Sequence, residues 1–181
     1  MVKTRVGYAG GTRENPTYRR IGDHMETVQI EYDPDRISYQ ELLEVFFSSH
    51  NPAHRSYARQ YASAILYHDS GQKKLAEEAM KRAERIRRKK IVTELLPYTG
   101  FTRAENYHQK YYLRNQENLH KFYRAIYPDP LRFTDSTAVA RVNGYLGGNG
   151  SREQFEREAP GLGLTDVEIR ALKKLIWKWR K

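Results

Sequence analysis

The residues that could do chemistry gather near the start of the chain, on either side of one strand boundary. Glu26 opens the apolar segment "ETVQIEY" (26–32), and His24 and Tyr18 lie shortly before it. A carboxyl at the mouth of an apolar strand can be partly desolvated, which raises its pKa and lets it act as an acid near neutral pH. The alternative interpretation is an exposed glutamate that merely begins a strand.

The loop before this strand, "VGYAGGTRENPTYRR" (6–20), is rich in glycine and invites a phosphate-binding interpretation. A phosphate loop needs G-x-x-x-x-G-K-[ST], and a dinucleotide loop needs G-x-G-x-x-G leading into a helix. Gly7, Gly10 and Gly11 fit neither pattern, because a coil-like sequence follows them. Two interpretations remain: an ordinary turn that uses glycine for positive φ, or the wall of a pocket that carries Tyr18.

Several other kinds of site are excluded by what the sequence lacks. It has no cysteine, which removes disulfides, thiolate zinc ligands and any cysteine nucleophile. No serine occurs in a G-x-S-x-G motif. The histidines are scattered without paired metal-ligand spacing, so a metal site is not expected. These histidines include His50, which can equally be a helix-terminus residue, and His54, His68 and His108.

Composition indicates one good core with a small appended subdomain in these 181 residues. The net charge of +10 would suit a nucleic-acid partner, but much of it lies in segments 81–90 and 172–181, which look like solvated helix faces. No apolar run approaches the ~20 residues of a membrane span. The first residues do not resemble a signal peptide, so a cytoplasmic protein is expected.

The apolar pattern predicts alternating strands and helices over the first two thirds of the chain. Strands are predicted over 3–9, 26–32, 59–68 and 91–96, and helices over 38–50, 71–90 and 103–115. Ser38 and Glu41 have the spacing of a capping box at one helix start. This order predicts an α+β fold, a two-layer ferredoxin-like sandwich that lacks its first strand and helix. We expect a domain over 1–127 and a small helical extension over 128–181.

Seven motifs occur in a consistent order: "GYAGG", "NPTYR", "GDHMETVQIEYDP", "ISYQELLEVFF", "QYASAI", "TEL" and "AENYHQKY". Together they resemble the peptide methionine sulfoxide reductase A family over roughly residues 3–115. Beyond about residue 128 the chain resembles an extension found in some members. The resemblance implies an α+β core that reduces the S epimer of methionine sulfoxide, free or in proteins. It also implies no cofactor, with thioredoxin as the usual reductant.

The resemblance further implies roles for individual residues. Tyr18 and Tyr61 would hold the sulfoxide oxygen, and a protonated Glu26 would supply its proton; His108 and Tyr111 match residues that the family places near the pocket. These roles are physically consistent, because the oxygen gains negative character as the S–O bond breaks and pre-placed O–H donors stabilise it most in the transition state. An ionised glutamate would repel that oxygen.

Two departures from the family pattern concern the other half of such a site. Family members attack the sulfoxide sulfur with a cysteine thiolate in a Gly-Cys-Phe-Trp-Gly motif, whose Phe and Trp hold the methyl group. This sequence has no such motif, and Trp177 and Trp179 are no obvious substitute. The segment "HNPAHRSYARQY" (50–61) is also shorter than the usual family loop and contains no aspartate.

Three hypotheses on function follow and stay open at this stage. The sequence could be an amino-terminally truncated reading of a working reductase. It could instead be complete and non-catalytic, as a binding module for methionine sulfoxide or for a protein partner. A basic nucleic-acid-binding protein is the third, supported by the charge alone.

Overall fold

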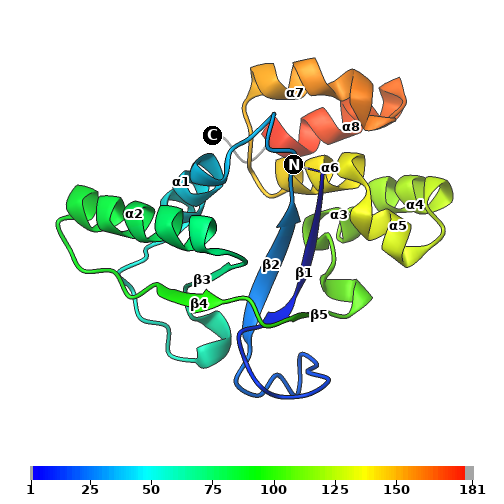
Figure 1. The fold of residues 1–181 in the computed structure, drawn as a ribbon. Helices are drawn as coiled ribbons and strands as arrows, with labels where there is room; N and C mark the ends of the chain where they lie inside the picture. The colour runs from blue at the N-terminus through cyan, green and yellow to red at the C-terminus, as the bar shows by residue number, and fades with distance from the viewer. Residues whose placement is uncertain (1, 178–181) are drawn as a thin grey trace. The chain divides into compact units, whose positions relative to one another are not determined.

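The computed structural model describes residues 2–177 (Figure 1). These residues form two compact units. The first unit comprises residues 6–105. The second comprises residues 2–5 and the described residues from 106 onward. Strand β1 (Lys3–Ala9) therefore begins in the second unit and continues into the first.

The first unit contains five strands in two sheets. Strands β2 (Met25–Glu31), β1 and β5 (Phe101–Arg103) form a three-stranded sheet in the order β2-β1-β5. Strands β3 (Ala64–Tyr67) and β4 (Glu94–Pro97) form a separate parallel pair. Parallel neighbours need a crossover connection, which is helix α2 (Ser70–Arg87) here.

Helix α1 (Tyr39–Ser49) packs against α2 over a small apolar core (Figure 1). The predicted capping box is confirmed: the Ser38 hydroxyl accepts from the backbone N–H of Glu41, whose carboxylate accepts from the N–H of Ser38 at 2.7 Å. Asp69 caps α2 in the same way by accepting from the N–H of Gln72 at 2.8 Å. Local capping thus fixes where both helices begin.

Two predicted elements of this part of the chain are wrong. The predicted strand over 59–68 is a 3₁₀ turn η1 (Arg59–Tyr61) followed by the short strand β3. The predicted helix over 103–115 is instead split among β5, a 3₁₀ turn η2 (Asn106–His108) and the short helix α3 (Tyr111–Arg114). Lys110 separates the last two with φ of 55°, a left-handed conformation that interrupts a helix.

The second unit is helical, as predicted for the end of the chain. Its further helices are α4 (Glu117–Ile126), α5 (Pro130–Asp135), α6 (Thr137–Leu146), α7 (Arg152–Glu158) and α8 (Asp166–Trp177), with a 3₁₀ turn η3 (Ala159–Leu162). They enclose an apolar core that includes Leu113, Tyr123, Phe133, Val142, Phe155, Leu162 and Leu172. Trp179 and the side chain of Trp177 lie outside the described residues.

Residues 2–5 are held in this helical unit by side chains. The Arg5 guanidinium donates to both oxygens of the Asp135 carboxylate, one of them at 2.7 Å. Lys110 donates from Nζ to the carbonyl of Thr4 at 2.8 Å, and Thr137 donates to the carbonyl of Val2 at 2.6 Å. The start of β1 is therefore fixed by ionic and hydrogen-bonded contacts.

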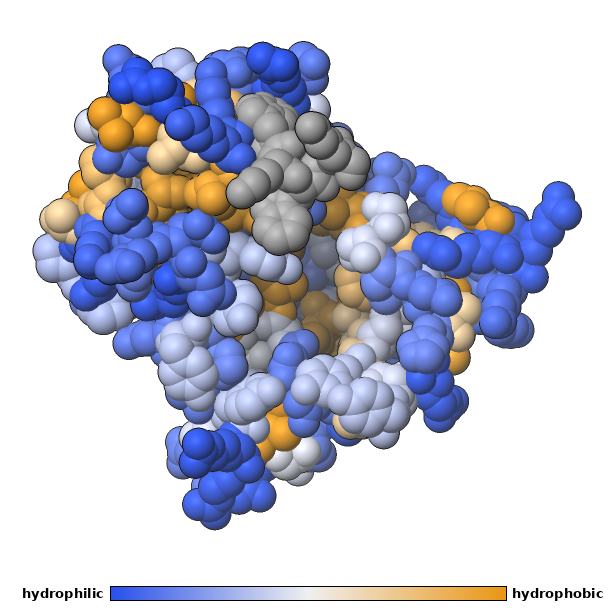
Figure 2. Space-filling view, turned by 180° about the vertical axis from the view of Figure 1, so that it is seen from behind, coloured by the Kyte–Doolittle hydropathy of each residue, from blue (hydrophilic) through white to orange (hydrophobic). Residues whose placement is uncertain are grey.

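The α+β class predicted from the sequence is confirmed by these elements. Hydrophilic residues cover most of the face drawn in Figure 2, and hydrophobic ones show in smaller patches. Across residues 2–177, no helix combines the length and the apolar character needed to cross a bilayer. Over the same range, no group of three or more histidine or acidic side chains is placed to hold a metal ion.

Candidate functional site

Three residues that the sequence singled out lie together in the first unit. Tyr61 ends η1, and its phenol is hydrogen-bonded to the side chain of Tyr18. Glu26, the second residue of β2, lies close enough to act electrostatically on the same phenol. The hydrogen bond with Tyr18, followed by burial and then the nearby charges, raises the pKa of Tyr61. Tyr61 is therefore a neutral O–H group at physiological pH.

The Glu26 carboxyl is exposed, contrary to the desolvation expected from its position at the mouth of an apolar strand. Its Oε1 accepts a hydrogen bond from the side-chain amide of Gln60 at 3.2 Å. Tyr18 and Tyr61 are also partly open to solvent, with exposed fractions of 41% and 43%. The cluster therefore lies at the surface, where water reaches each of its polar groups.

A cavity of ≈ 530 Å³ opens beside this cluster, and Glu26 and Tyr61 both line it. Its other walls include residues of β2, α1 and β3, and β2 contributes Val28 and Ile30. These two side chains are 56% and 38% exposed, a large fraction for apolar residues at alternate positions of a strand. Each of β2 and β3 pairs with one strand in the described sheets, so the cavity lies between two sheet edges.

The loop that carries Tyr18 is held at its base by Asp23. The Asp23 carboxylate accepts hydrogen bonds from the backbone N–H groups of Thr12 and Arg13, at 2.8 Å and 3.2 Å. The Thr12 hydroxyl donates to it as well, at 3.0 Å. The backbone bond from Thr12 is the main cause that lowers the pKa of Asp23 to about 2. This carboxylate is thus ionised throughout the physiological range.

His24 completes the base of the loop. Its Nε2 lies 2.8 Å from the carbonyl oxygen of Arg13 and its Nδ1 accepts from the N–H of Gly11 at 3.2 Å. A carbonyl only accepts, so the ring is the neutral tautomer with its proton on Nε2. A Cβ on Gly11 would lie 2.6 Å from the backbone nitrogen of His24, so only glycine allows this approach. The glycine-rich loop is therefore a clamped loop that presents Tyr18.

His50 is the C-cap residue of α1, the helix-terminus position considered from the sequence. Its Nδ1 donates to the carbonyl of Phe46 at 2.8 Å, which leaves Nε2 to accept from the Ser63 hydroxyl at 2.9 Å. Ser63 in turn lies 2.9 Å from the Thr93 hydroxyl. This chain of bonds joins the end of α1 to the segments that begin β3 and β4.

His108 and Tyr111 belong to the helical unit, in η2 and α3. The His108 ring packs against that of Tyr107 with centroids 4.2 Å apart, and Tyr111 is 60% exposed. The role near the pocket that the family resemblance implies for both residues stays a prediction.

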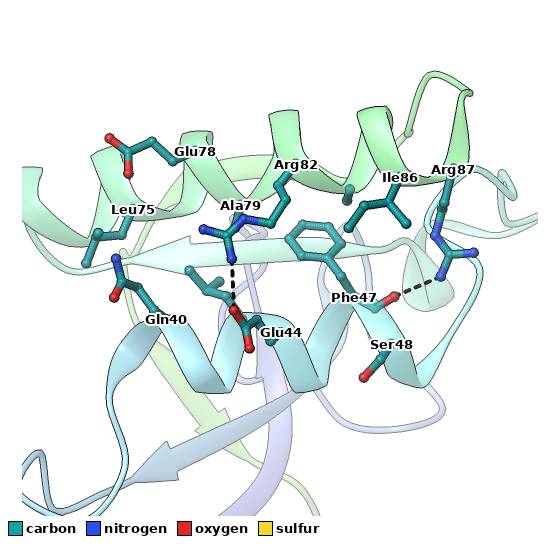
Figure 3. Close-up of a pocket in the computed structure, with 12 residues that line it drawn as sticks. Gln40, Glu44, Phe47, Ser48, Leu75, Glu78, Ala79, Arg82, Ile86 and Arg87 are labelled. Carbon is teal, nitrogen blue, oxygen red and sulfur yellow. Dashed lines mark hydrogen bonds and ion pairs between the residues drawn. The ribbon is translucent and has the colours of Figure 1, made fainter.

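A second hollow in the first unit, of ≈ 560 Å³, lies between α1 and α2 (Figure 3). Its apolar floor includes Phe47, and charged groups bridge the two helices. Arg82 donates to Glu44 at 2.9 Å, and Arg87 donates to the carbonyl of Phe47 at 2.9 Å. None of the residues proposed for chemistry from the sequence lines this groove.

Asp23 was missed as a functional residue, and His24 was noticed only as a neighbour of Glu26. The signal for both was present in "GDHMET", because an Asp-His pair placed between a glycine-rich loop and a strand can accept from loop backbone N–H groups.

The cluster of Tyr18, Tyr61 and Glu26 offers two phenol donors and one carboxyl around an exposed point. Such a group suits a polar, uncharged oxygen acceptor.

Sequence models of two known families match this chain. The model described as peptide methionine sulfoxide reductase matches residues 1–138. A second model, described as the helical domain of selenoprotein methionine sulfoxide reductase A, matches residues 132–177. The chain belongs to the peptide methionine sulfoxide reductase family, which confirms the resemblance predicted from the motifs.

Individual relatives agree with this assignment. The chain is similar to a peptide methionine sulfoxide reductase of Drosophila melanogaster, with 42% identity over 93% of this chain and 68% of the relative. It is 46% identical to the enzyme of that name from Sulfolobus acidocaldarius, over 62% of this chain and 69% of the relative. The structure of reduced Mxr1 from Saccharomyces cerevisiae superposes with a TM-score of 0.60 at 28% identity, covering 63% of this chain and 71% of Mxr1.

Proposed function

We propose that this chain binds the S–O group of methionine S-sulfoxide and that its own side chains do not reduce it. The observation that supports the proposal is the hydrogen-bonded pair of phenols, Tyr18 and Tyr61, with Glu26 beside them. Family membership supports the choice of ligand, free or within a protein.

Each group of the cluster has a distinct part in binding. A sulfoxide oxygen accepts hydrogen bonds and donates none, so it matches the two phenol O–H groups. Glu26 contributes a third donor only when its carboxyl is protonated, since an ionised carboxylate would repel the oxygen. The apolar cavity beside Glu26 and Tyr61 suits the thioether end of the methionine side chain.

Reduction needs a nucleophile that attacks the sulfur and takes over the oxygen as a sulfenic acid. No residue of the 181 is a cysteine, so this polypeptide cannot form that intermediate. A thiol from another segment or molecule would be required, and thioredoxin would act only after such a thiol had been oxidised. Binding without turnover is therefore the activity that the residues present can support.

The test is an NMR titration of the full chain with N-acetyl-L-methionine S-sulfoxide methylamide, with the R epimer and the unoxidised methionine amide as comparison ligands. Tyr18→Phe and Tyr61→Phe each remove one donor, and we expect affinity to fall about 2- to 10-fold, as for loss of one hydrogen bond. Tyr67→Phe is the matched control, because Tyr67 lies in β3, outside the cluster, and has its ring beside Lys73.

A reduction assay with dithiothreitol completes the design. We expect no conversion of either epimer by the purified chain. Conversion of the S epimer would overturn the non-reducing part of the proposal. Equal affinities for sulfoxide and methionine, or an unchanged affinity in both phenylalanine variants, would overturn the assignment of the site.

A further inference from the structure

Glu105 lies just beyond the end of β5, where pairing with β1 fixes the backbone. Gly7 and Arg103 are register partners in the antiparallel β1–β5 pair. The N–H of Ala104 then donates to the carbonyl of Val6 at 3.0 Å, which extends the pairing by one residue. The Glu105 side chain is therefore projected from a fixed point of the three-stranded sheet.

The Glu105 carboxylate joins two tyrosines that are far from it in the sequence. Its Oε2 accepts from the hydroxyl of Tyr8 at 2.6 Å, and its Oε1 accepts from the backbone N–H of Tyr18 at 3.1 Å. Tyr8 belongs to β1 and is 2% exposed, whereas Tyr18 is 41% exposed. One end of this bridge is thus anchored in the core, and the other end holds a surface loop.

Tyr18 occupies the first inner position of a tight turn. The turn is closed by a bridge between Thr17 and Arg20, with the Arg20 N–H donating to the Thr17 carbonyl at 3.0 Å. Asp23 and His24 hold the base of the loop, several residues away from this turn. The bond to Glu105 therefore ties the turn itself to the sheet, at the residue whose phenol joins the cluster.

We propose that Glu105 is a positioning residue, which places the Tyr18 phenol for contact with the sulfoxide oxygen without contacting that oxygen itself. The inference rests on the function proposed above. A donor that is fixed before binding loses less conformational freedom when the ligand arrives, and this is the advantage that Glu105 provides.

The chemistry of the bridge predicts different effects for two substitutions of Glu105. Glu105→Gln keeps one oxygen that can accept from the Tyr18 N–H, and its amide group can donate to the Tyr8 hydroxyl, which accepts as readily as it donates. Glu105→Ala removes both bonds. Positioning therefore predicts that glutamine rescues the function, whereas a requirement for the negative charge predicts that it does not.

The experiment measures affinity for N-acetyl-L-methionine S-sulfoxide methylamide in the full chain by NMR titration. We expect Glu105→Ala to weaken binding by the same factor as Tyr18→Phe, about 2- to 10-fold. Combining the two substitutions should cause no further loss, because the phenol is already misplaced in Glu105→Ala. Glu105→Gln should bind within about twofold of the original chain.

Glu105→Ala leaves the buried Tyr8 hydroxyl without this acceptor and can unfold the chain for that reason alone. The second variant is Tyr8→Phe/Glu105→Ala, which removes the hydroxyl while still releasing Tyr18, and it should show the same loss of affinity. Additive effects of Glu105→Ala and Tyr18→Phe would overturn the inference, as would an unchanged affinity in the folded Ala variants.

Hydrogen exchange of the Tyr18 amide separates this inference from the proposed function. Protection of that amide should be lost in both Ala variants and kept in Glu105→Gln, whether or not the ligand binds. If the original chain does not bind the sulfoxide, the proposed function fails; protection that stays unchanged in the Ala variants overturns the role of Glu105.

Discussion

Lys110 is the residue whose replacement should most clearly change the pH dependence of stability. It is 6% exposed within the helical unit, and its Nζ donates to the carbonyl and hydroxyl of Thr4 at 2.8 Å and 2.6 Å. Burial, the largest cause, lowers the pKa of Lys110 from 10.5 to about 8; the nearby Arg5 also lowers it, and Asp135 opposes the change. The unfolded chain keeps the ordinary value.

The sign of the effect follows from proton binding. Between about pH 8 and pH 10.5 the unfolded chain binds the lysine proton and the folded chain releases it, so folding becomes more favourable as pH rises. At about 1.36 kcal/mol per pKa unit, the whole difference corresponds to about 3 kcal/mol. From pH 7 to pH 9 the free energy of unfolding should rise by about 1.4 kcal/mol, before tyrosines begin to titrate in the unfolded chain.

The assay is urea unfolding at pH 7, 8 and 9 for the original chain, Lys110→Met and Lys110→Arg. Methionine removes the titrating group and arginine stays protonated throughout, so both variants should lack the rise. Each substitution can change the free energy of unfolding by an amount that is the same at every pH. Comparing how each chain changes with pH removes this constant difference. The reasoning is refuted if the original chain and Lys110→Met change in parallel between pH 7 and pH 9.

Three further substitutions test other parts of the fold. Gly11→Ala places a Cβ 2.6 Å from the His24 nitrogen, so the loop clamp should open and the pKa of Asp23, seen by carboxyl NMR, should return from about 2 toward 3.8. Gly144→Ala puts a methyl into open space within α6, and thermal unfolding should show stabilisation by about 0.5–1 kcal/mol. Tyr123→Phe removes the hydroxyl that donates to the buried carbonyl of Leu162 at 2.8 Å, and urea unfolding should show a loss of about 1–3 kcal/mol.

Local sequence patterns were sufficient to predict the helices and strands that local interactions determine. The strand over 3–9 was predicted with the bounds it has, and α1 begins at the capping box of Ser38 and Glu41. Both depend on neighbouring residues: alternation along a strand and a side chain that satisfies the first N–H groups of a helix. The predicted strand over 26–32 and helix over 71–90 likewise differ from β2 and α2 by only a few residues at their ends.

Elements that depend on residues far away in the sequence could not be predicted from local patterns. The segment "RAENYHQKYYLRN" (103–115) has no glycine or proline and looks helical, yet its first residue pairs with Gly7 across the sheet. Lys110 then reaches Thr4 from a left-handed backbone conformation. Sheet pairing and a buried ammonium are long-range interactions, which override local helix propensity.

The candidate site also contains residues that the sequence motifs indicated and long-range contacts that they did not. The motifs pointed to Tyr18, Glu26 and Tyr61, and the structure brings these three together. The bond that ties Tyr18 to the sheet could not be inferred, because Glu105 accepts from the backbone N–H of a residue that is far from it in the sequence. No motif links these two positions, whereas Asp23 and His24 stand beside the loop that they hold.

The exposure of the cluster sets a limit on its affinity. Two phenols, each more than 40% exposed, exchange bonds with water when they bind an oxygen acceptor, so each contributes about 0.5–1.5 kcal/mol net. Even with a protonated Glu26 as a third donor, the three bonds sum to about 4.5 kcal/mol at most, which alone corresponds to a dissociation constant of about 0.5 mM or weaker. Loss of ligand freedom weakens binding further.

The same donors would stabilise a developing negative charge far more strongly if water were excluded, because electrostatic interactions strengthen in a low dielectric. The arrangement in this chain is therefore suited to weak recognition of a sulfoxide, and a cover over the cavity beside Glu26 and Tyr61 would be the physical requirement for anything stronger.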